Sequence, residues 1–265
     1  MSNSQSVDRA RRFGGVARLY GEAALARLQQ ARVVVAGIGG VGSWVVEALA
    51  RSGVGHLRLI DLDHVAESNI NRQIHALDDT LGQAKIEAMA ARIRLIDPGI
   101  VVECIDDFVT EANVATTLAG PVDLVVDAID DLSAKAAIVL HCRRHGIRLI
   151  TLGAAGGQTD PTRIVIGDLS RTEQDPLLAR LRKRLRQKHG FSRNPARRFG
   201  IDAVYSTEPL RYPEGSCDAV VGPAGLNCAG FGSSIAVTAS FGLAAASRAI
   251  DRLLAAAPAP DSTQE

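Results

Sequence analysis

Short apolar runs alternate along this chain with longer segments in which apolar residues recur at helical spacing. The runs at 32–36, 56–60, 100–105, 122–128 and 147–152 are rich in Val, Ile and Leu and predict strands. The segments between them predict helices at 43–51, 79–96 and 133–145, and a further helix beginning near Thr110. Strands and helices that alternate in this way form a parallel sheet covered on both faces. The pattern therefore predicts an α/β fold with a Rossmann-like, doubly wound and mainly parallel sheet.

The two ends of the chain follow different patterns. The first twelve residues are polar and predict a loose arm, whereas the spacing of apolar residues predicts a helix at 16–30. After the glycine-rich segment 153–161 the rhythm changes, and 162–167 predicts a strand of an antiparallel C-terminal extension. The run 219–247 carries no charged side chain, but its glycines, alanines and Pro223 favour a helix at about 230–254 buried in a protein core over a membrane span.

A glycine-rich turn follows the first predicted strand. Gly37, Gly39 and Gly42 have the GxGxxG spacing, with Gly40 between them, and an apolar helix follows directly. Such glycines let the backbone approach a phosphate, which the N–H groups at the helix start bind. The next strand ends in Asp61 and Asp63, about twenty residues further on, where a carboxylate can bind ribose hydroxyls. These features predict a nucleotide site.

Polar residues after the second strand narrow the kind of nucleotide chemistry. Asn69, Asn71, Arg72 and Gln73 follow the acidic residues closely, and Lys85 ends the sequence GQAK. Cations and amides beside a phosphate loop suit a triphosphate whose α-phosphorus is attacked, because charge builds on its oxygens in the transition state. A nicotinamide enzyme needs its pyrophosphate held and not attacked, so this cluster favours ATP.

The strand at 122–128 delivers three carboxylates to the carboxyl edge of the sheet. They are Asp127, Asp130 and Asp131. A carboxylate at this edge can hold Mg²⁺ against nucleotide phosphates. All three also fit turn or helix-cap roles, Asp131 above all because it precedes Ser133.

Composition limits the classes of partner. The 265 residues are 46% hydrophobic and carry a net charge of +1, so the whole-molecule field does not favour nucleic acid. A local patch does, because segment 180–198 contains nine basic residues and no acid. The nine candidates for contact with nucleic-acid phosphates are Arg180, Arg182, Lys183, Arg184, Arg186, Lys188, Arg193, Arg197 and Arg198. A solvated helix face is the alternative interpretation.

Several motifs together identify a family resemblance. GIGGVGS, DLDxxxxSNxNRQ, GQAK and VVDAIDD resemble the ATP-dependent adenylating superfamily of ThiF, MoeB and the ubiquitin-activating enzymes. RFGGVARLYGEAAL, NRQIHAL, DDFVT, GAAGGQTDPT and DLSRTEQDPL resemble, more narrowly, the tRNA threonylcarbamoyladenosine dehydratase family (TcdA, also called CsdL). This second similarity extends over about 12–248, nearly the whole chain.

The resemblance implies roles for individual residues. The segment 39–42 would hold phosphates, Asp63 would bind ribose, and Asp130 would hold magnesium against ATP. Asn69, Arg72 and Lys85 would grip the triphosphate. Arg12 matches an arginine that enters the partner subunit's site in the superfamily, so the resemblance implies a homodimer with shared active sites.

The implied activity is ATP-dependent cyclisation of N6-threonylcarbamoyladenosine in tRNA, by adenylation of its threonyl carboxylate. The partner would then be tRNA, and not DNA, gripped by segment 180–198. The alternative is adenylation of the C-terminus of a ubiquitin-like sulfur carrier. Protein-activating members of the superfamily commonly carry two CxxC zinc pairs, and the four cysteines here (Cys104, Cys142, Cys217 and Cys228) form no such pair. A nicotinamide reductase is disfavoured because none of Tyr20, Tyr205 and Tyr212 is followed by Lys four residues on.

These inferences divide the chain into a polar arm (1–15), an ATP-binding half (16–152), a substrate-facing or tRNA-facing half (153–254) and a disordered tail (255–265). The cysteine usage and the lack of a signal peptide lead us to expect a cytoplasmic protein. The sequence leaves open a monovalent cation near the loop 153–157, a sulfur-transfer (cysteine desulfurase system) partner, and any role of Cys217 and Cys228.

Overall fold

The computed structural model describes residues 7–212 and 231–255. Within them, seven strands form one sheet in the order β3-β2-β1-β4-β5-β7-β6. The strands are β1 (Arg32–Ala36), β2 (His56–Ile60), β3 (Val101–Ile105), β4 (Leu124–Asp127), β5 (Arg148–Leu152), β6 (Ile164–Asp168) and β7 (Asp202–Ser206). Neighbouring strands are parallel except for β6 and β7, which are antiparallel. The predicted doubly wound, mainly parallel α/β sheet is confirmed.

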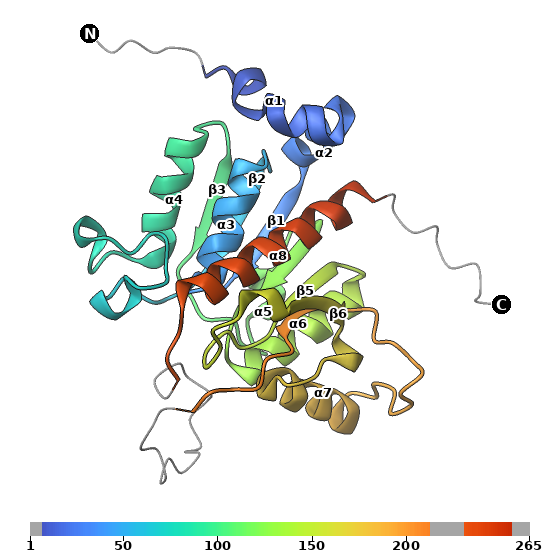
Figure 1. The fold of residues 1–265 in the computed structure, drawn as a ribbon. Coiled ribbons are helices and arrows are strands. Elements are labelled where there is room, and N and C mark those ends of the chain that lie inside the picture. The colour runs from blue at the N-terminus through green and yellow to red at the C-terminus, as the bar shows by residue number, and fades with distance from the viewer. Residues whose placement is uncertain (1–6, 213–230, 256–265) are drawn as a thin grey trace, which may run out of the picture.

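Helices cover both faces of this sheet (Figure 1). The described helices are α1 (Arg9–Tyr20), α2 (Glu22–Gln30), α3 (Gly42–Arg51), α4 (Lys85–Ile96), α5 (Val114–Thr117), α6 (Leu132–His145), α7 (Pro176–Lys188) and α8 (Ile235–Leu254). One core lies between the sheet and α3, α4 and α8, and a second core lies between the sheet and α5, α6 and α7.

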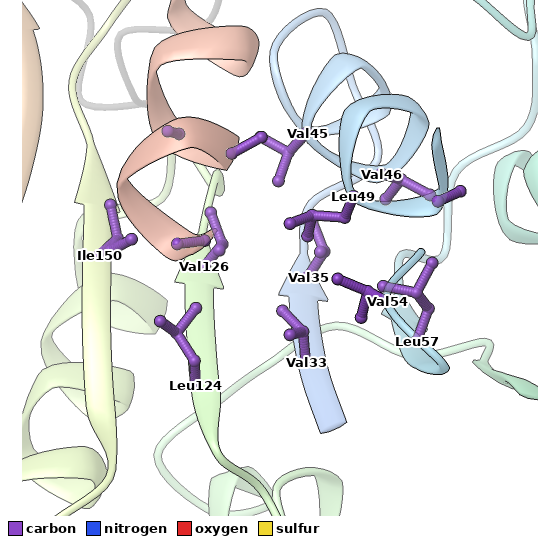
Figure 2. Close-up of a cluster of buried hydrophobic side chains, with 14 of the residues drawn as sticks. Val33, Val35, Val45, Val46, Leu49, Val54, Leu57, Leu124, Val126 and Ile150 are labelled. Carbon is purple, nitrogen blue, oxygen red and sulfur yellow. The ribbon is translucent and has the colours of Figure 1, made fainter. Parts of the chain in front are cut away.

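Side chains of the central strands point alternately to the two faces of the sheet and so contribute to both cores. Val33 and Val35 of β1 belong to the core under α3 and α8, whereas Val34 and Ala36 belong to the opposite core. Figure 2 shows the first of these cores, in which side chains of β1 lie against those of α3 and Ile150 of β5 lies beside α8. Because strand residues point alternately to either face, a continuous apolar run is what a parallel strand covered on both sides requires.

The N-terminal expectation was wrong in two respects. The chain is helical from Arg9, inside the segment expected to be loose, because the Asp8 carboxylate accepts a hydrogen bond from the Arg11 N–H and Phe13 packs with Leu25. The expected single helix at 16–30 is two helices that meet at Gly21, whose φ of +95° ends the first one.

Two further boundaries differ from the predicted ones. Helix α4 begins at Lys85 and not at position 79, because residues Asp78–Thr80 form a separate 3₁₀ turn and Gly82 has a φ of +79°. Near Thr110 only the short helix α5 forms. Strand β7 was not predicted. It lies between β5 and β6, so the antiparallel strand expected at 162–167 extends the same sheet.

Helix α8 explains the uncharged C-terminal run as far as the structure describes it. One side of the helix, including Val237, Phe241, Ala245 and Ala249, is buried against the sheet and α3, and Leu243 on the other side is exposed. Of the tail expected at 255–265, residues 256–265 lie outside the described residues. No helix in the described part of the chain is both long enough and apolar enough to cross a membrane.

Candidate active site

A cavity of about 630 Å³ opens at the carboxyl ends of the parallel strands. It lies where the strand order reverses between β1 and β4, the place where open α/β sheets bind ligands. The loops after β1, β2, β3, β4 and β5 all contribute to its lining. Ten of the twelve residues predicted to bind nucleotide line this one cavity: Gly37, Gly39, Gly40, Asp61, Asp63, Asn69, Arg72, Gln73, Lys85 and Asp130.

The glycine loop is shaped by close backbone contacts. Gly37 has a φ of +88°, and a Cβ there would meet the Ala128 backbone at 2.9 Å. Gly42 does not line the cavity. A Cβ on it would lie 1.8 Å from the Gly37 carbonyl oxygen, so this glycine allows α3 to begin directly beside the loop. Gly40 lies against the Arg72 side chain. A Cβ added at position 40 would be 3.2 Å from Arg72 Cδ.

Asp61 and Asp63, the two acids after β2, make different contacts. One Asp61 oxygen accepts a hydrogen bond from the Ile38 N–H at 2.5 Å, and the other accepts one from the Asp63 N–H at 2.9 Å. Burial raises the pKa of Asp61, and the Lys85 charge and these N–H donors oppose that shift. Asp61 therefore holds the glycine loop in place. Asp63 is exposed, and its carboxylate forms an ion pair with Lys85 Nζ at 2.7 Å.

Arg72 is held by neighbours on several sides. Its guanidinium donates to the Ser68 carbonyl at 2.6 Å and to Asn71 Oδ1 at 2.9 Å, and its own carbonyl accepts from Trp44 Nε1 at 2.9 Å. Asn71 does not itself line the cavity. It reaches toward α8 instead, with its amide 3.4 Å from the Ser233 carbonyl. Trp44 was missed from sequence because its contact joins residues 28 positions apart.

The carboxylates after β4 separate into buried and exposed groups. Asp127 is fully buried, 3.0 Å from Lys135 Nζ and 2.7 Å from Thr151 Oγ1. Asp131 caps α6 by accepting from the Ser133 and Ala134 N–H groups, both at 2.8 Å. Asp130 is exposed on the same loop and lines the cavity. Asp131 is also exposed and lines the cavity, but one of its carboxylate oxygens is engaged in capping α6, so Asp130 is the carboxylate best placed to meet a ligand.

Further residues form a second wall of the same cavity. We define this second wall as Gly153, Ala154, Ala155, Gly156, Pro176, Leu177, Leu210 and Phe231. It is mostly apolar, and it combines the loop after β5 with the start of α7. Apart from the loop 153–157, no sequence pattern pointed to it, because the wall gathers positions that are far apart in the chain. The loop after β3 adds Phe108, whose side chain is 55% exposed at the cavity.

Arg12 lies far from this cavity. Together with Phe13, Arg51, Arg92, Leu95 and Ile96 it lines a separate hollow of about 370 Å³. Its guanidinium donates to the Ile96 carbonyl at the end of α4. The C-terminal ends of α3 and α4 lie at the opposite edge of the sheet from the glycine loop, and α1 occupies that end of the molecule (Figure 1).

The basic segment 180–198 lies on α7 and the loop after it, outside the cavity. Three of its arginines have intramolecular partners: Arg182 donates to Thr172, Arg184 donates to Ser133 at 3.0 Å, and Arg186 donates to the Ser170 and Ser192 carbonyls at 3.3 Å. The exposed members are Arg180, Lys183, Lys188, Arg193, Arg197 and Arg198.

The described cysteines are poor nucleophiles. Burial raises the pKa of Cys142 to about 12, and burial with the nearby Glu87 charge raises that of Cys104 to about 11. Both are therefore protonated thiols at neutral pH. Cys217 and Cys228 lie outside the described residues.

Comparison with known proteins agrees with this geometry. A family model described as the ThiF family matches residues 13–263. The tRNA threonylcarbamoyladenosine dehydratase of Haemophilus influenzae is 53% identical over 92% of this chain and 93% of its own length. Its counterpart in Escherichia coli is 51% identical over 93% of this chain and 94% of its own.

A solved structure extends the comparison to three dimensions. The Escherichia coli tRNA N6-threonylcarbamoyladenosine dehydratase, TcdA, in complex with ATP, superposes with a TM-score of 0.84 at 48% identity, covering 92% of this chain and 94% of that one. Similarity of this extent leaves no large part of either chain unmatched. The chain belongs to the ThiF family and, within it, to the tRNA threonylcarbamoyladenosine dehydratases.

Proposed function

We propose that this protein dehydrates N6-threonylcarbamoyladenosine in tRNA to its cyclic hydantoin form, using ATP to adenylate the threonyl carboxylate. One observation carries the proposal. A single cavity joins a glycine loop, Lys85, Arg72 and Asp130 to a mostly apolar second wall that leaves room for an acyl donor. The named relatives and the ATP complex of a structure 48% identical to this chain support it.

In this proposal the triphosphate lies along the glycine loop. The backbone of Gly37, Gly39 and Gly40 approaches its phosphates, and Arg72 and Lys85 neutralise them. Asn69 and Gln73 also line the cavity and supply polar side chains there. Asp63 binds the ribose hydroxyls, whereas Asp61 keeps the loop in shape through the Ile38 N–H.

Asp130 fits a magnesium role by its chemistry. An exposed carboxylate at the rim of a phosphate cavity is the hard oxygen donor that Mg²⁺ prefers, and Mg²⁺ bound with phosphates needs only one or two protein carboxylates. The described residues contain no cluster of three or more His, Cys, Asp or Glu that would form an all-protein metal cage. When bound, the ion would neutralise charge on the phosphates.

The reaction follows from these positions. The threonyl carboxylate attacks the α-phosphorus of ATP, the bond from that phosphorus to the bridging oxygen breaks, and pyrophosphate leaves. A nitrogen of the same modified side chain then attacks the activated carbonyl, closes the hydantoin ring and expels AMP, which retains the oxygen lost from the substrate. Because the second attack is intramolecular, no covalent enzyme intermediate is needed. This agrees with the protonated state of Cys104 and Cys142.

The decisive experiment is mass spectrometry of nucleosides after incubation with ATP, Mg²⁺ and tRNA that carries the threonylcarbamoyl group. We expect that nucleoside to lose one water, with AMP and pyrophosphate formed in equal amounts. Lys85→Met should lose most of this turnover and Lys85→Arg should retain more of it, because a cation is needed at this position. Adenylation of a ubiquitin-like sulfur carrier, with the nucleoside unchanged, would instead support the alternative activity.

We also propose that Arg12 completes the cavity of a partner subunit in a homodimer. Within its own chain Arg12 lies at the opposite edge of the sheet from the cavity, so it can contribute only to another copy. Mixing Arg12→Ala protein with Lys85→Ala protein should restore up to about a quarter of wild-type turnover, since one dimer in two is mixed and has one intact site. No rescue after subunit exchange would contradict shared sites.

We propose, finally, that the exposed cations of α7 and the following loop contact tRNA phosphates. Helix α6 extends this surface, because Arg143 and Arg144 at its end are exposed and the Arg143 guanidinium lies 4.3 Å from the centre of the Phe191 ring. Helix α7 also begins at the cavity, where Pro176 and Leu177 belong to the second wall. A tRNA bound along α7 would therefore approach the cavity from that side.

A further inference from the structure

Asp175 links two parts of the molecule that the sequence keeps apart. It precedes α7 and is only 3% exposed. One of its carboxylate oxygens accepts a hydrogen bond from the Leu178 N–H in the first turn of α7, at 2.8 Å. The other accepts one from the Ala154 N–H in the loop after β5, at 2.9 Å. A single buried carboxylate thus fastens the start of the basic helix α7 to the loop after β5, and both line the cavity.

Gly153 packs directly against the Asp175 carboxylate, with no space for a side chain. A Cβ at position 153 would lie 1.9 Å from Asp175 Oδ2 and 2.9 Å from its Cγ. Gly153 is not among the residues of positive φ, so its backbone conformation does not itself require glycine. The contact with Asp175 is what excludes a side chain there. Gln174, just before Asp175, has a φ of +53°, an uncommon conformation for a residue with a side chain.

A series of buried polar groups leads from Asp175 to the loop that carries Asp130. Burial raises the pKa of Asp175, and the Leu178 and Ala154 N–H groups and the charge of Lys135 oppose that shift. Lys135 is fully buried and contacts Asp127 at 3.0 Å. Asp127 in turn accepts from the Ile129 N–H at 3.2 Å, one residue before Asp130. The buried polar groups therefore contact both the loop after β5 and the loop after β4, and both loops line the cavity.

The helix-capping Asp168 lacks this connection to the cavity. Asp168 also caps a short helix, accepting from the Ser170 N–H at 2.9 Å, and it also joins a distant segment through the Phe199 and Gly200 N–H groups. Neither Asp168 nor any of those partners lines the cavity. Asp168 therefore provides a matched structural control for Asp175.

We propose that Asp175 is a positioning residue that couples the basic helix α7 to the cavity. By fixing the loop 153–156 relative to α7, it sets where a tRNA held on α7 places its reacting carboxylate against the nucleotide. This inference rests on the proposed function and deepens it. It predicts that loosening the link reduces turnover without removing either ATP or tRNA binding.

The test compares Asp175→Ser with Asp168→Ser. Serine retains a capping acceptor for the helix, but its single short hydroxyl cannot serve the Leu178 and Ala154 N–H groups together. Asp175→Ser should bind ATP and tRNA within about twofold of wild type and show a kcat about tenfold to hundredfold lower, the scale of a displacement of about 1 Å at a reacting centre. Asp168→Ser should turn over at close to the wild-type rate per folded molecule.

A double-mutant cycle with Gly153 separates coupling from general damage. Gly153→Ala should reduce kcat in the wild-type background, because the new Cβ displaces Asp175. In the Asp175→Ser background, which removes the carboxylate that the Cβ would meet, the same change should have little further effect. Independent, multiplicative losses from the two changes would contradict a shared contact.

The outcomes also distinguish this inference from the proposed function. Wild-type turnover of the modified nucleoside is measured first, and its absence would overturn the proposed function together with the inference. If wild type is active and Asp175→Ser has an equal kcat, only the coupling role fails. It fails equally if Asp175→Ser loses ATP binding, tRNA binding and thermal stability in parallel, since that is the result of simple unfolding.

Discussion

His75 is a buried residue with an unusual electrostatic environment. It is 2% exposed, and neither ring nitrogen has a hydrogen-bond partner among the described residues. Burial, together with the charges of Lys85 and Arg92, lowers its pKa to about 4. The imidazole is therefore neutral at working pH, and it lies close enough to Lys85 to sense the cation that we assign to the phosphates.

This environment predicts a specific pH dependence of stability. The unfolded chain takes up a proton on His75 near pH 6.5, but the folded chain does so only near pH 4, so stability falls as pH drops through that window. The loss attributable to His75 should approach about 3 kcal/mol. Urea unfolding at several pH values between 7 and 4 should show a weaker decline for His75→Leu than for wild type. Identical declines would contradict the shifted pKa.

Residue type was sufficient to predict some members of the site and not others. Gly37, Lys85 and Asp130 were predictable because spacing after a strand determines which edge of the sheet they reach. Trp44 and Asp175 were not, because each acts through a contact with a residue 21 to 28 positions away. The different roles of Asp61, which holds the loop, and Asp63, which contacts Lys85, could not be predicted either. They depend on the backbone geometry after β2, which the sequence DLD does not show.

At the scale of elements, the packing of α8 on α3 helps to fix the position of the glycine loop. A Cβ on Gly242 would meet Trp44 Cβ at 2.6 Å and the Val41 carbonyl oxygen at 2.7 Å. Val41 lines the cavity, and Trp44 bonds the Arg72 carbonyl. The glycine therefore permits a close helix crossing on which the position of the loop depends.

We expect Gly242→Ala to destabilise the protein by about 1–3 kcal/mol, since strain from overpacking exceeds the gain of about 1 kcal/mol from alanine's helix propensity. ATP binding should weaken as well, because Val41 must move. Gly14→Ala is the control. That position is also helical, and the nearest atom to its new Cβ is the flexible Arg18 guanidinium at 3.5 Å. It should be neutral or stabilising in denaturant unfolding, and equal stability of both variants would contradict the close-packing argument.

The central elements were predicted well and the peripheral ones less well. The apolar runs of β1, β4 and β5 are unambiguous because nearly all of their residues are buried on both faces. Helix α1 was missed because its polar residues outnumber the few that pack, Phe13 and Ala17. Strand β7 was missed because a short run after the basic loop has no strong pattern, and its neighbours β5 and β6 determine its place.

At the scale of the whole molecule, charge is nearly balanced, but its distribution is not. The chain has a net charge of +1, yet the exposed cations of α7 and the following loop have no acid among them from 180 to 198. The structure also shows which of these cations can be replaced to test the tRNA proposal. Arg182 and Arg186 are engaged within the fold, so replacing them would confuse binding with stability.

The sharper test therefore neutralises Arg180, Lys183 and Lys188, which are exposed on α7. The triple glutamine variant should bind tRNA more weakly and with a shallower dependence on salt, the slope of log affinity against log salt falling by about 0.7–0.9 for each phosphate that the variant no longer neutralises. ATP affinity should be unchanged, because none of the three lines the cavity. Filter binding across a range of salt concentrations measures both the affinity for tRNA and its salt dependence.

A control of equal charge change comes from three exposed arginines of α1 and α4, namely Arg11, Arg18 and Arg94. Their replacement by glutamine alters the net charge by the same amount, so any effect of the overall field on tRNA would appear in both variants. Weaker binding confined to the α7 variant would locate the tRNA site on that helix. Equal weakening in both variants, or none in either, would support the alternative interpretation of segment 180–198 as a solvated surface. The tRNA would then have to approach the cavity across another face of the molecule.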